Sequence, residues 1–195
     1  TAIMKLILFI VLVLIRSIAI CQESAYTQPM TLGIHFTFTD FETATAIRSS
    51  SLSSVLKGNS FGKLANMSQG LAISFGKGLS DHYDFAGTLM GSFLTYPIPG
   101  HAETGSEGLL WEADASIRGK MLPDKYWFVP YVQVGVGVSK YQGYWGTFIP
   151  AGVGIQINFF GEAYLLINSQ YRIAVSESTN YHFVHTIGLV GNIGK

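Results

Sequence analysis

The stretch GLLWEADASIRGKM, residues 108–121, sorts its side chains into two unlike classes. Large apolar or small side chains occupy every second position, and charged or hydroxyl-bearing side chains occupy the positions between them. Because successive side chains of a β-strand point to opposite faces, this period of two predicts a strand with one apolar and one polar face. The apolar face carries Leu109, Trp111, Ala113, Ala115, Ile117 and Met121, and the polar face carries Glu112, Asp114, Ser116, Arg118 and Lys120.

The same alternation recurs after residue 28 and predicts eight strands. We expect them at residues 30–39, 69–78, 82–96, 108–121, 126–141, 147–160, 163–175 and 181–194. Longer links (40–68, 97–107, 142–146, 176–180) alternate along the chain with short ones (79–81, 122–125, 161–162). Transmembrane barrels show this alternation because one rim carries short turns and the other carries larger loops. Within the first long link, residues 48–57 have apolar side chains at helical spacing and predict a short helix.

Residue size indicates which face of the strands meets lipid. The interior of an eight-stranded barrel is just wide enough for side chains to fill, so it cannot hold so many Leu, Ile, Val and Phe residues while small ones occupy the outside. Charged residues make up 12% of the chain, whereas a soluble surface usually carries about 25–35%. We therefore predict an all-β, eight-stranded, antiparallel up-and-down transmembrane β-barrel with its polar side chains in the lumen. A soluble periplasmic barrel is the structural alternative.

The predicted lumen carries charges of both signs. Charges at bilayer depth are costly unless they are paired, so the mixture predicts a salt-bridged plug that closes and stabilises the barrel. A charge-lined pore or gate is the alternative, although eight strands leave little room for a water channel. The predicted polar network comprises Glu112, Asp114, Arg118, Lys120, Gln133, Gln156, Asn158, Asn168, Gln170 and Arg172.

Glycines form a second predicted feature of the lumen wall, in the fifth and sixth strands. A hairpin centred between residues 144 and 145 would bring two pairs of glycines together on the lumen side. Their small size would leave space for bulky lumen groups such as Arg118, Arg172 or Tyr131, or would let the sheet coil tightly. The two interpretations are compatible. The predicted pairs are Gly135 with Gly154 and Gly137 with Gly152.

The N-terminus has the organisation of a secretory signal peptide. A basic start at residues 4–5 precedes an apolar core at residues 6–15 and a small-x-small exit at residues 19–22. We therefore expect a signal-peptide helix over residues 1–21, with Thr1–Ile3 upstream of the start.

A transmembrane anchor is the alternative, but Arg16 interrupts a stretch already too short to span a bilayer comfortably. Cleavage after Cys21 would remove the only cysteine, and with it any disulfide or cysteine-ligated metal site. The barrel domain would then occupy residues 22–195.

The sequence offers little for catalysis or cofactor binding. A rim hydrolase would need a Ser or Asp beside a His, and Ser176 and Ser178 do precede His182 and His185. These two histidines are separated by an odd number of residues, so they point to opposite faces of a strand and are expected to be separate rim residues. No metal-ligand spacing or phosphate-binding loop is present, and we expect no cofactor. Equal numbers of basic and acidic residues give no indication of nucleic-acid binding.

With these features, the sequence resembles the small outer-membrane β-barrel proteins of Gram-negative bacteria that are related to the OmpA transmembrane domain. The resemblance rests on the signal segment and on the stretches PYVQVGVGV (130–138), PAGVGI (150–155) and GLVGNIGK (188–195). It implies a monomer in outer-membrane lipid with a structural or surface-interaction role, and external loops that are able to bind a surface ligand. A small porin-like channel for ions or solutes is the alternative. Many such barrels end in an aromatic residue or continue into a peptidoglycan-binding domain, whereas this sequence ends in Lys195.

Overall fold

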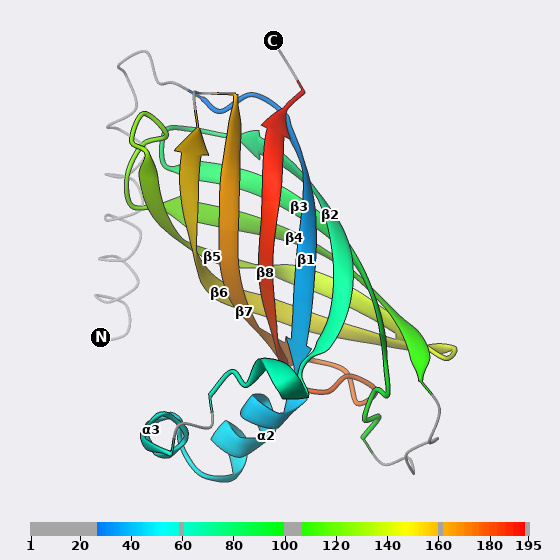
Figure 1. Ribbon diagram of the computed structural model, residues 1–195. Coiled ribbons are helices and arrows are strands. Elements are labelled where there is room, and N and C mark those ends of the chain that lie inside the picture. Colours follow the sequence, from blue (N-terminus) through cyan, green and yellow to red (C-terminus); the bar gives the residue numbers. More distant parts are fainter. Residues whose placement is uncertain (1–26, 59–60, 100–106, 160–161, 194–195) are drawn as a thin grey trace, which may run out of the picture.

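The computed structural model describes residues 27–58, 61–99, 107–159 and 162–193. They form a closed antiparallel barrel in which each strand pairs with its neighbours in sequence and β1 pairs with β8 (Figure 1). This confirms the predicted fold, whereas the predicted signal peptide lies outside the described residues. None of the helices that these residues form is long and apolar enough to cross a membrane. The strands are β1 (Thr31–Asp40), β2 (Ser68–Gly78), β3 (Tyr83–Leu94), β4 (Gly108–Lys120), β5 (Phe128–Tyr141), β6 (Tyr144–Phe159), β7 (Ala163–Ala174) and β8 (His182–Asn192).

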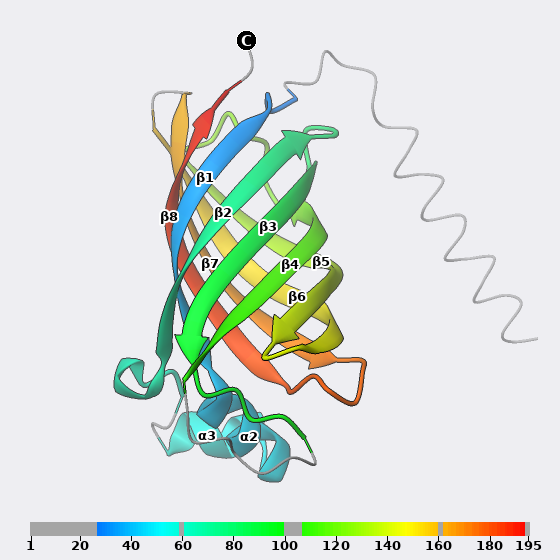
Figure 2. The same cartoon turned by 90° about the vertical axis from the view of Figure 1, so that its right-hand side faces the viewer.

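The two ends of the barrel differ in their connections (Figure 2). The loop end, defined by the links that follow β1, β3, β5 and β7, carries the helices α2 (Phe41–Ser49) and α3 (Leu52–Lys57) and the 3₁₀ helix η1 (Leu64–Asn66). The turn end, defined by the links that follow β2, β4 and β6, carries no helix among the described residues. The predicted sorting of long and short links is therefore confirmed for the two long links that follow β1 and β3. The link after β7 (175–181) is only as long as the one after β4 (121–127), and the link between β5 and β6 is short.

That exception is a tight two-residue turn, where the sequence analysis expected a longer loop and a later start for β6. Both Gln142 (φ 45°) and Gly143 (φ 92°) have left-handed backbone conformations. This combination is typical of the two-residue hairpin turns whose twist matches that of the flanking strands. The strands consequently pair directly up to Tyr141 and Tyr144.

The position of this turn makes the predicted glycine pairs wrong. Gly137 lies opposite Phe148, Gly152 lies opposite Gln133, and Gly154 lies opposite Tyr131. The observed partner of Gly137, Phe148, lies an even number of positions along β6 from the predicted partner, Gly152. Because strand side chains alternate with a period of two, such a slip changes partners but keeps the same side chains facing the lumen.

The wall of the barrel has the predicted distribution of side chains. Apolar side chains point outward and are largely exposed, with values of 66% for Ile34, 67% for Val136 and 64% for Leu189. Charged side chains such as Glu112 and Arg172 are each only 1% exposed. Apolar side chains share the lumen with them, in three buried clusters built around Leu110, Tyr131 and Met90. A soluble protein has the reverse arrangement: its charged side chains lie on the surface and are almost never fully buried without a partner.

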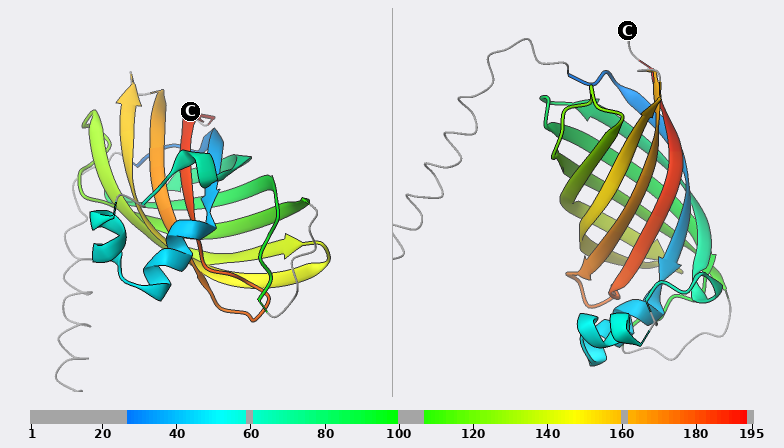
Figure 3. Two further views of the ribbon diagram at one scale, coloured as in Figure 1. Left: turned by 60° about the horizontal axis from the view of Figure 1, so that its bottom comes forward. Right: turned by 60° about the vertical axis from the view of Figure 1, so that its left-hand side comes forward.

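The first long link begins as a helix at the end of β1. Asp40 caps α2, since its carboxylate accepts a hydrogen bond from the Thr43 backbone N–H at 2.8 Å. Ser51 caps α3 in the same way through the Ser54 N–H. The helix α3 confirms the one predicted within residues 48–57, whereas α2 was not predicted. Figure 3 shows α2 at the loop end of the barrel, where it packs against β8.

Candidate functional site in the barrel lumen

The loop-end network consists of Glu112, Asp114, Arg172 and His182, which β4, β7 and β8 bring together across the lumen. Arg172 Nη1 lies 2.5 Å from Glu112 Oε2, and Arg172 Nη2 lies 3.4 Å from Asp114 Oδ2. His182 Nε2 lies 3.3 Å from the other carboxylate oxygen of Glu112. The four residues are between 0% and 7% exposed. One guanidinium therefore bridges two carboxylates inside the barrel, and this compensates part of the cost of burying all three charges.

Aromatic rings enclose this network. The Arg172 guanidinium carbon lies 4.5 Å from the centre of the Phe148 ring, and Phe148 occupies space that Gly137 leaves free, because a Cβ atom on Gly137 would lie 2.4 Å from this ring. Toward the loop end, the ring of Phe41 from α2 lies 4.9 Å from that of His182. Tyr96 completes the enclosure with its ring 6.2 Å from that of His182.

Tyr96 also links two loops above the network. Its hydroxyl accepts a hydrogen bond from the Asn180 N–H at 2.7 Å, and the Asn180 side chain donates to the Pro97 carbonyl at 3.0 Å. Burial raises the pKa of Tyr96 above its ordinary value. Its hydroxyl is therefore neutral at physiological pH and is available for these contacts.

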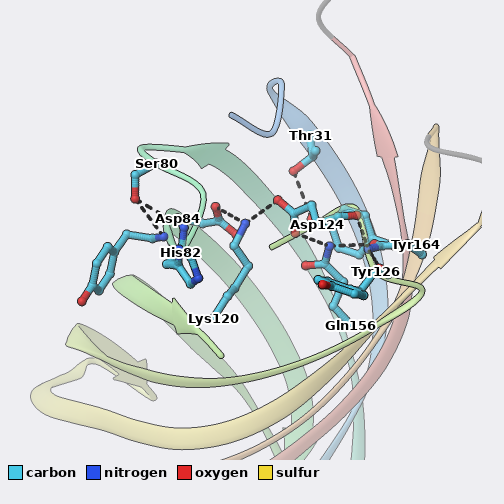
Figure 4. A network of polar contacts seen from close by, with 11 residues as sticks. Thr31, Ser80, His82, Asp84, Lys120, Asp124, Tyr126, Gln156 and Tyr164 are labelled. Atoms are coloured by element: carbon cyan, nitrogen blue, oxygen red, sulfur yellow. Dashed lines mark hydrogen bonds and ion pairs between the residues drawn. The ribbon is translucent and has the colours of Figure 1, made fainter. Parts of the chain in front are cut away.

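The turn-end network joins Lys120 to Asp84 of β3 and to Asp124 of the link between β4 and β5 (Figure 4). Lys120 Nζ lies 2.8 Å from Asp84 Oδ1 and also forms a short ion pair with Asp124. Gln156 donates to Asp124 at 3.0 Å and to the Asn158 side chain at 2.7 Å. Asn158 in turn donates to the Tyr126 carbonyl at 2.7 Å. This network therefore holds the β4–β5 link across the turn end of the lumen.

Between the two networks lies Arg118, which is 6% exposed and has no carboxylate within ion-pair distance among the described residues. Its guanidinium carbon lies 5.4 Å from the centre of the Tyr131 ring. On the wall beside it, Asn168 donates to Gln133 at 2.8 Å. Gln170 is 4% exposed, and its Oε1 atom has no hydrogen-bond partner among the described residues. The middle of the lumen is therefore polar but has fewer ion pairs than its ends.

The four glycines predicted to line the lumen are all on its wall, although they do not face one another. A Cβ atom on Gly154 would lie 2.4 Å from the Tyr131 ring, so this glycine leaves room for one of the predicted bulky groups. At Gly135 and Gly152 the closest atoms are backbone oxygens of the adjacent strands, at 2.2 and 2.5 Å. Glycine here permits close approach both of a lumen side chain and of neighbouring backbone, as expected for a tightly coiled sheet.

Three members of the networks were not predicted from the sequence: Asp84, Asp124 and His182. Asp84 shares its face with Ala86 and Ser92, so alternation within β3 was a usable signal. His182 was expected to be an isolated rim residue, but it is fully buried, covered by Phe41 of the unpredicted helix α2 and by Tyr96. His182 and His185 do point to opposite faces, as expected. Among the described residues, no group of three or more His, Cys, Asp or Glu side chains is placed to bind a metal ion.

Comparison with known proteins finds proteins of similar structure. Neither a protein-family model nor a curated protein matches the sequence. Neisserial surface protein A matches with a TM-score of 0.58 and 12% identity, over 86% of this chain and 99% of that one. The outer membrane protein OprG from Pseudomonas aeruginosa matches with a TM-score of 0.55 and 10% identity, over 86% and 97% of the two chains.

A third similar structure is the N-terminal β-barrel domain of Pseudomonas aeruginosa OprF. It matches with a TM-score of 0.51 and 11% identity, over 83% of this chain and 96% of that one. All three similarities span nearly the whole of the matched structure, although few residues are identical. The chain therefore has the fold of the small, eight-stranded β-barrels found among bacterial outer-membrane proteins.

Proposed function

We propose that this chain is an integral outer-membrane protein with a closed, structural lumen and a loop end that serves as an interaction surface. The observation that carries the proposal is the reversed sorting of side chains, with apolar ones outside and paired charges inside. Such a wall is stable only where lipid surrounds it, because exposed apolar area of this extent is rare on soluble monomers. The structural similarity to outer-membrane barrels supports the same location.

The side chains that fill the lumen support the proposal that the lumen is closed to ions and solutes. Arg172 connects β7 to β4 near the loop end, and Lys120 holds the β4–β5 link near the turn end. The buried cluster of Leu94, Tyr96 and Leu110 adds an apolar layer beside the loop-end network. Because an eight-stranded barrel has little interior volume, these side chains leave no wide path along its axis.

The same enclosure supports a non-enzymatic role. His182 is the histidine that a rim hydrolase would use, but it is fully buried and faces Glu112. A general base must reach the proton that it removes from a substrate or a nucleophile. Phe41 and Tyr96 lie against His182 on the side where a substrate would enter.

Arg118 is the observation that favours the alternative, a small channel for ions or solutes. A buried cation without a carboxylate partner is costly unless water or an anion accompanies it. Single-channel recording in planar bilayers distinguishes the two functions. We expect no steady conductance from the wild-type protein. Steady conductance that is lost in Arg118→Ala but kept in Lys140→Ala, which changes an outward-facing basic residue, would overturn the closed lumen and support the channel.

The membrane location has a separate test. After expression in a Gram-negative host, the protein should fractionate with the outer membrane and require detergent for extraction. Mass measurement of the extracted chain should show that it starts at Gln22, as the proposed signal peptide requires. Recovery in the aqueous fraction without detergent would contradict the membrane location.

A further inference from the structure

The first loop, described for residues 41–58 and 61–67, folds over the rim of the barrel onto the outer wall through its residue Phe61. The ring of Phe61 lies 5.7 Å from that of Phe183 and 6.3 Å from that of His185. Both partners alternate with the lumen-facing residues of β8 and therefore lie on the outward side of the strand. The loop consequently contacts the same surface that lipid would cover, instead of extending only away from the membrane.

A second contact fixes the start of this loop to the outer wall. The Arg48 guanidinium carbon of α2 lies 4.0 Å from the centre of the Tyr181 ring. Tyr181 stacks on Tyr171 with ring centres 6.1 Å apart, and Tyr171 contacts Phe183 at 4.8 Å. These aromatic rings lie near the loop end, at the level where aromatic side chains of membrane proteins meet lipid headgroups.

The loop also exposes apolar side chains. Val55 is the buried residue of α3, at 4% exposure, whereas Leu52 and Leu56, one helical turn apart, are 50% and 54% exposed. Leu64 of η1 is 69% exposed. Figure 1 shows α3 to the side of the point where β1 and β8 reach the loop end. The helix lies past the ends of the strands (Figure 2). A segment that presents leucines at the rim of the proposed membrane-facing wall is suited to the interfacial layer of a bilayer.

The charge of this loop is of one sign after its first turn. Residues 43–68 contain Arg48, Lys57 and Lys63 but no acidic residue. All three basic side chains are exposed. Basic residues close to a membrane surface are attracted to anionic lipids, each by about fivefold in binding constant. The combination of exposed leucines and unopposed basic residues matches a lipid that has both acyl chains and a phosphate group.

The outer wall next to the loop provides room for such a lipid. An apolar groove of about 520 Å³ runs across β5 to β8 as far as Phe38 of β1, and is also lined by His185 and Ile187. His185 is shared with the loop, since it also contacts Phe61. The groove therefore begins where the loop meets the wall.

We propose that the first loop and this groove bind an anionic, phosphate-bearing lipid of the leaflet at the loop end. The basic side chains contact the phosphate, the leucines of α3 and η1 enter the interface, and an acyl chain lies in the groove. The loop then holds one class of lipid against the barrel. This inference rests on the proposed membrane location and adds to it a specific lipid partner.

The test measures contact between the loop and lipid in the full chain. In the mature chain, which the proposed cleavage leaves without a cysteine, Leu56→Cys carries an environment-sensitive fluorophore, and Glu177→Cys in the exposed β7–β8 link carries the same label as a control. The protein is reconstituted in phosphatidylcholine vesicles with or without phosphatidylglycerol, and brominated acyl chains serve as the quencher. We expect stronger quenching at position 56 when phosphatidylglycerol is present, and no such change at position 177.

The triple variant Arg48→Gln, Lys57→Gln, Lys63→Gln should remove this preference, with a loss of up to about a hundredfold in affinity for the anionic lipid. Lys125→Gln, at the turn end, should leave the preference unchanged. Equal quenching in both kinds of vesicle, or an unaltered preference in the triple variant, would overturn the proposal. Protease protection of the strands provides the separate readout. If the strands are protected from protease but quenching at position 56 does not depend on the lipid, only this inference is wrong. If the strands are not protected, the proposed membrane location is wrong as well.

Discussion

The two charge networks in the lumen differ in what they connect. The loop-end network crosses the barrel, since Arg172 of β7 holds two carboxylates of β4 and is enclosed by Phe148 and α2. The turn-end network is local, since Lys120 of β4 pairs with Asp84 of the neighbouring strand β3 and with Asp124 of the link that follows β4. Opposite walls of a barrel share no backbone hydrogen bonds, so only side chains can join them. We therefore expect the loop-end network to contribute more to stability.

The largest expected effect is that of removing Arg172. Arg172→Ala leaves Glu112 and Asp114 buried and close together without a cation, and we expect a loss of about 3–5 kcal/mol in the free energy of unfolding. Urea-induced unfolding in lipid vesicles, followed by tryptophan fluorescence, measures it. Adding Glu112→Gln and Asp114→Asn to the same chain should restore most of the stability. If the triple variant is no more stable than Arg172→Ala, packing rather than charge accounts for the loss.

A smaller loss is expected when the other network is broken. Lys120→Met should cost about 2 kcal/mol, because Asp124 belongs to a link and can turn toward water after its partner is lost. The same unfolding experiment compares the two variants directly. A loss as large as that of Arg172→Ala would show that a local network stabilises the barrel as strongly as one that crosses it.

Substitutions of glycine compare the surroundings of the loop-end network with those of Arg118 in the middle of the lumen. Gly137→Ala forces the Phe148 ring away from Arg172, and Gly154→Ala forces the Tyr131 ring away from the wall. Each overpacking should cost about 1–3 kcal/mol. Gly191→Ala is the matched control, because a Cβ atom there has no neighbour within 4 Å. In a double-mutant cycle, we expect Gly137→Ala to reduce the further loss of stability that Arg172→Ala causes. A reduction by Gly154→Ala would show instead that the surroundings of Arg118 are coupled to the loop-end network.

The smallest effect is expected above the loop-end network. Tyr96→Phe removes the hydroxyl that accepts the Asn180 N–H and should cost about 1 kcal/mol. Hydrogen exchange of the Asn180 amide is the sensitive measurement, since its protection depends on that bond. Unchanged protection would show that another group, or water, satisfies this amide.

The strands and their faces were predictable from the sequence because period-two alternation is a local property. The β5–β6 turn was not predicted, because Gln142-Gly143 lacks the Asn or Asp that most clearly identifies such a turn. The error shifted the predicted pairing of β5 with β6, but it left each side chain on its predicted face of the sheet. For this reason the lumen positions of Glu112 and Arg172 could be predicted, whereas the partner of each glycine could not.

The lumen partners depended on features without a periodic signal. Asp124 lies in a link, and the burial of His182 depends on Tyr96 and on α2. The sequence of this helix, FETATAIRS, contains several β-branched residues that lower helix propensity. Which carboxylates surround Arg172 depends on how the sheet closes. Alternation identifies the residues that enter the lumen, but barrel closure determines which of them meet.

The closure of β1 on β8 has a consequence for assembly. Residues 31–40 pair with residues 183–192, so the first strand of the barrel finds its last partner only after every other strand is present. Until then the sheet has two open edges, whose unpaired backbone groups are costly in lipid. Insertion of a partly closed sheet is therefore unfavourable at every stage before the last. If the barrel lies in a membrane, as proposed above, crossing the bilayer and closing the barrel are expected to be a single cooperative event that ends with the pairing of β8.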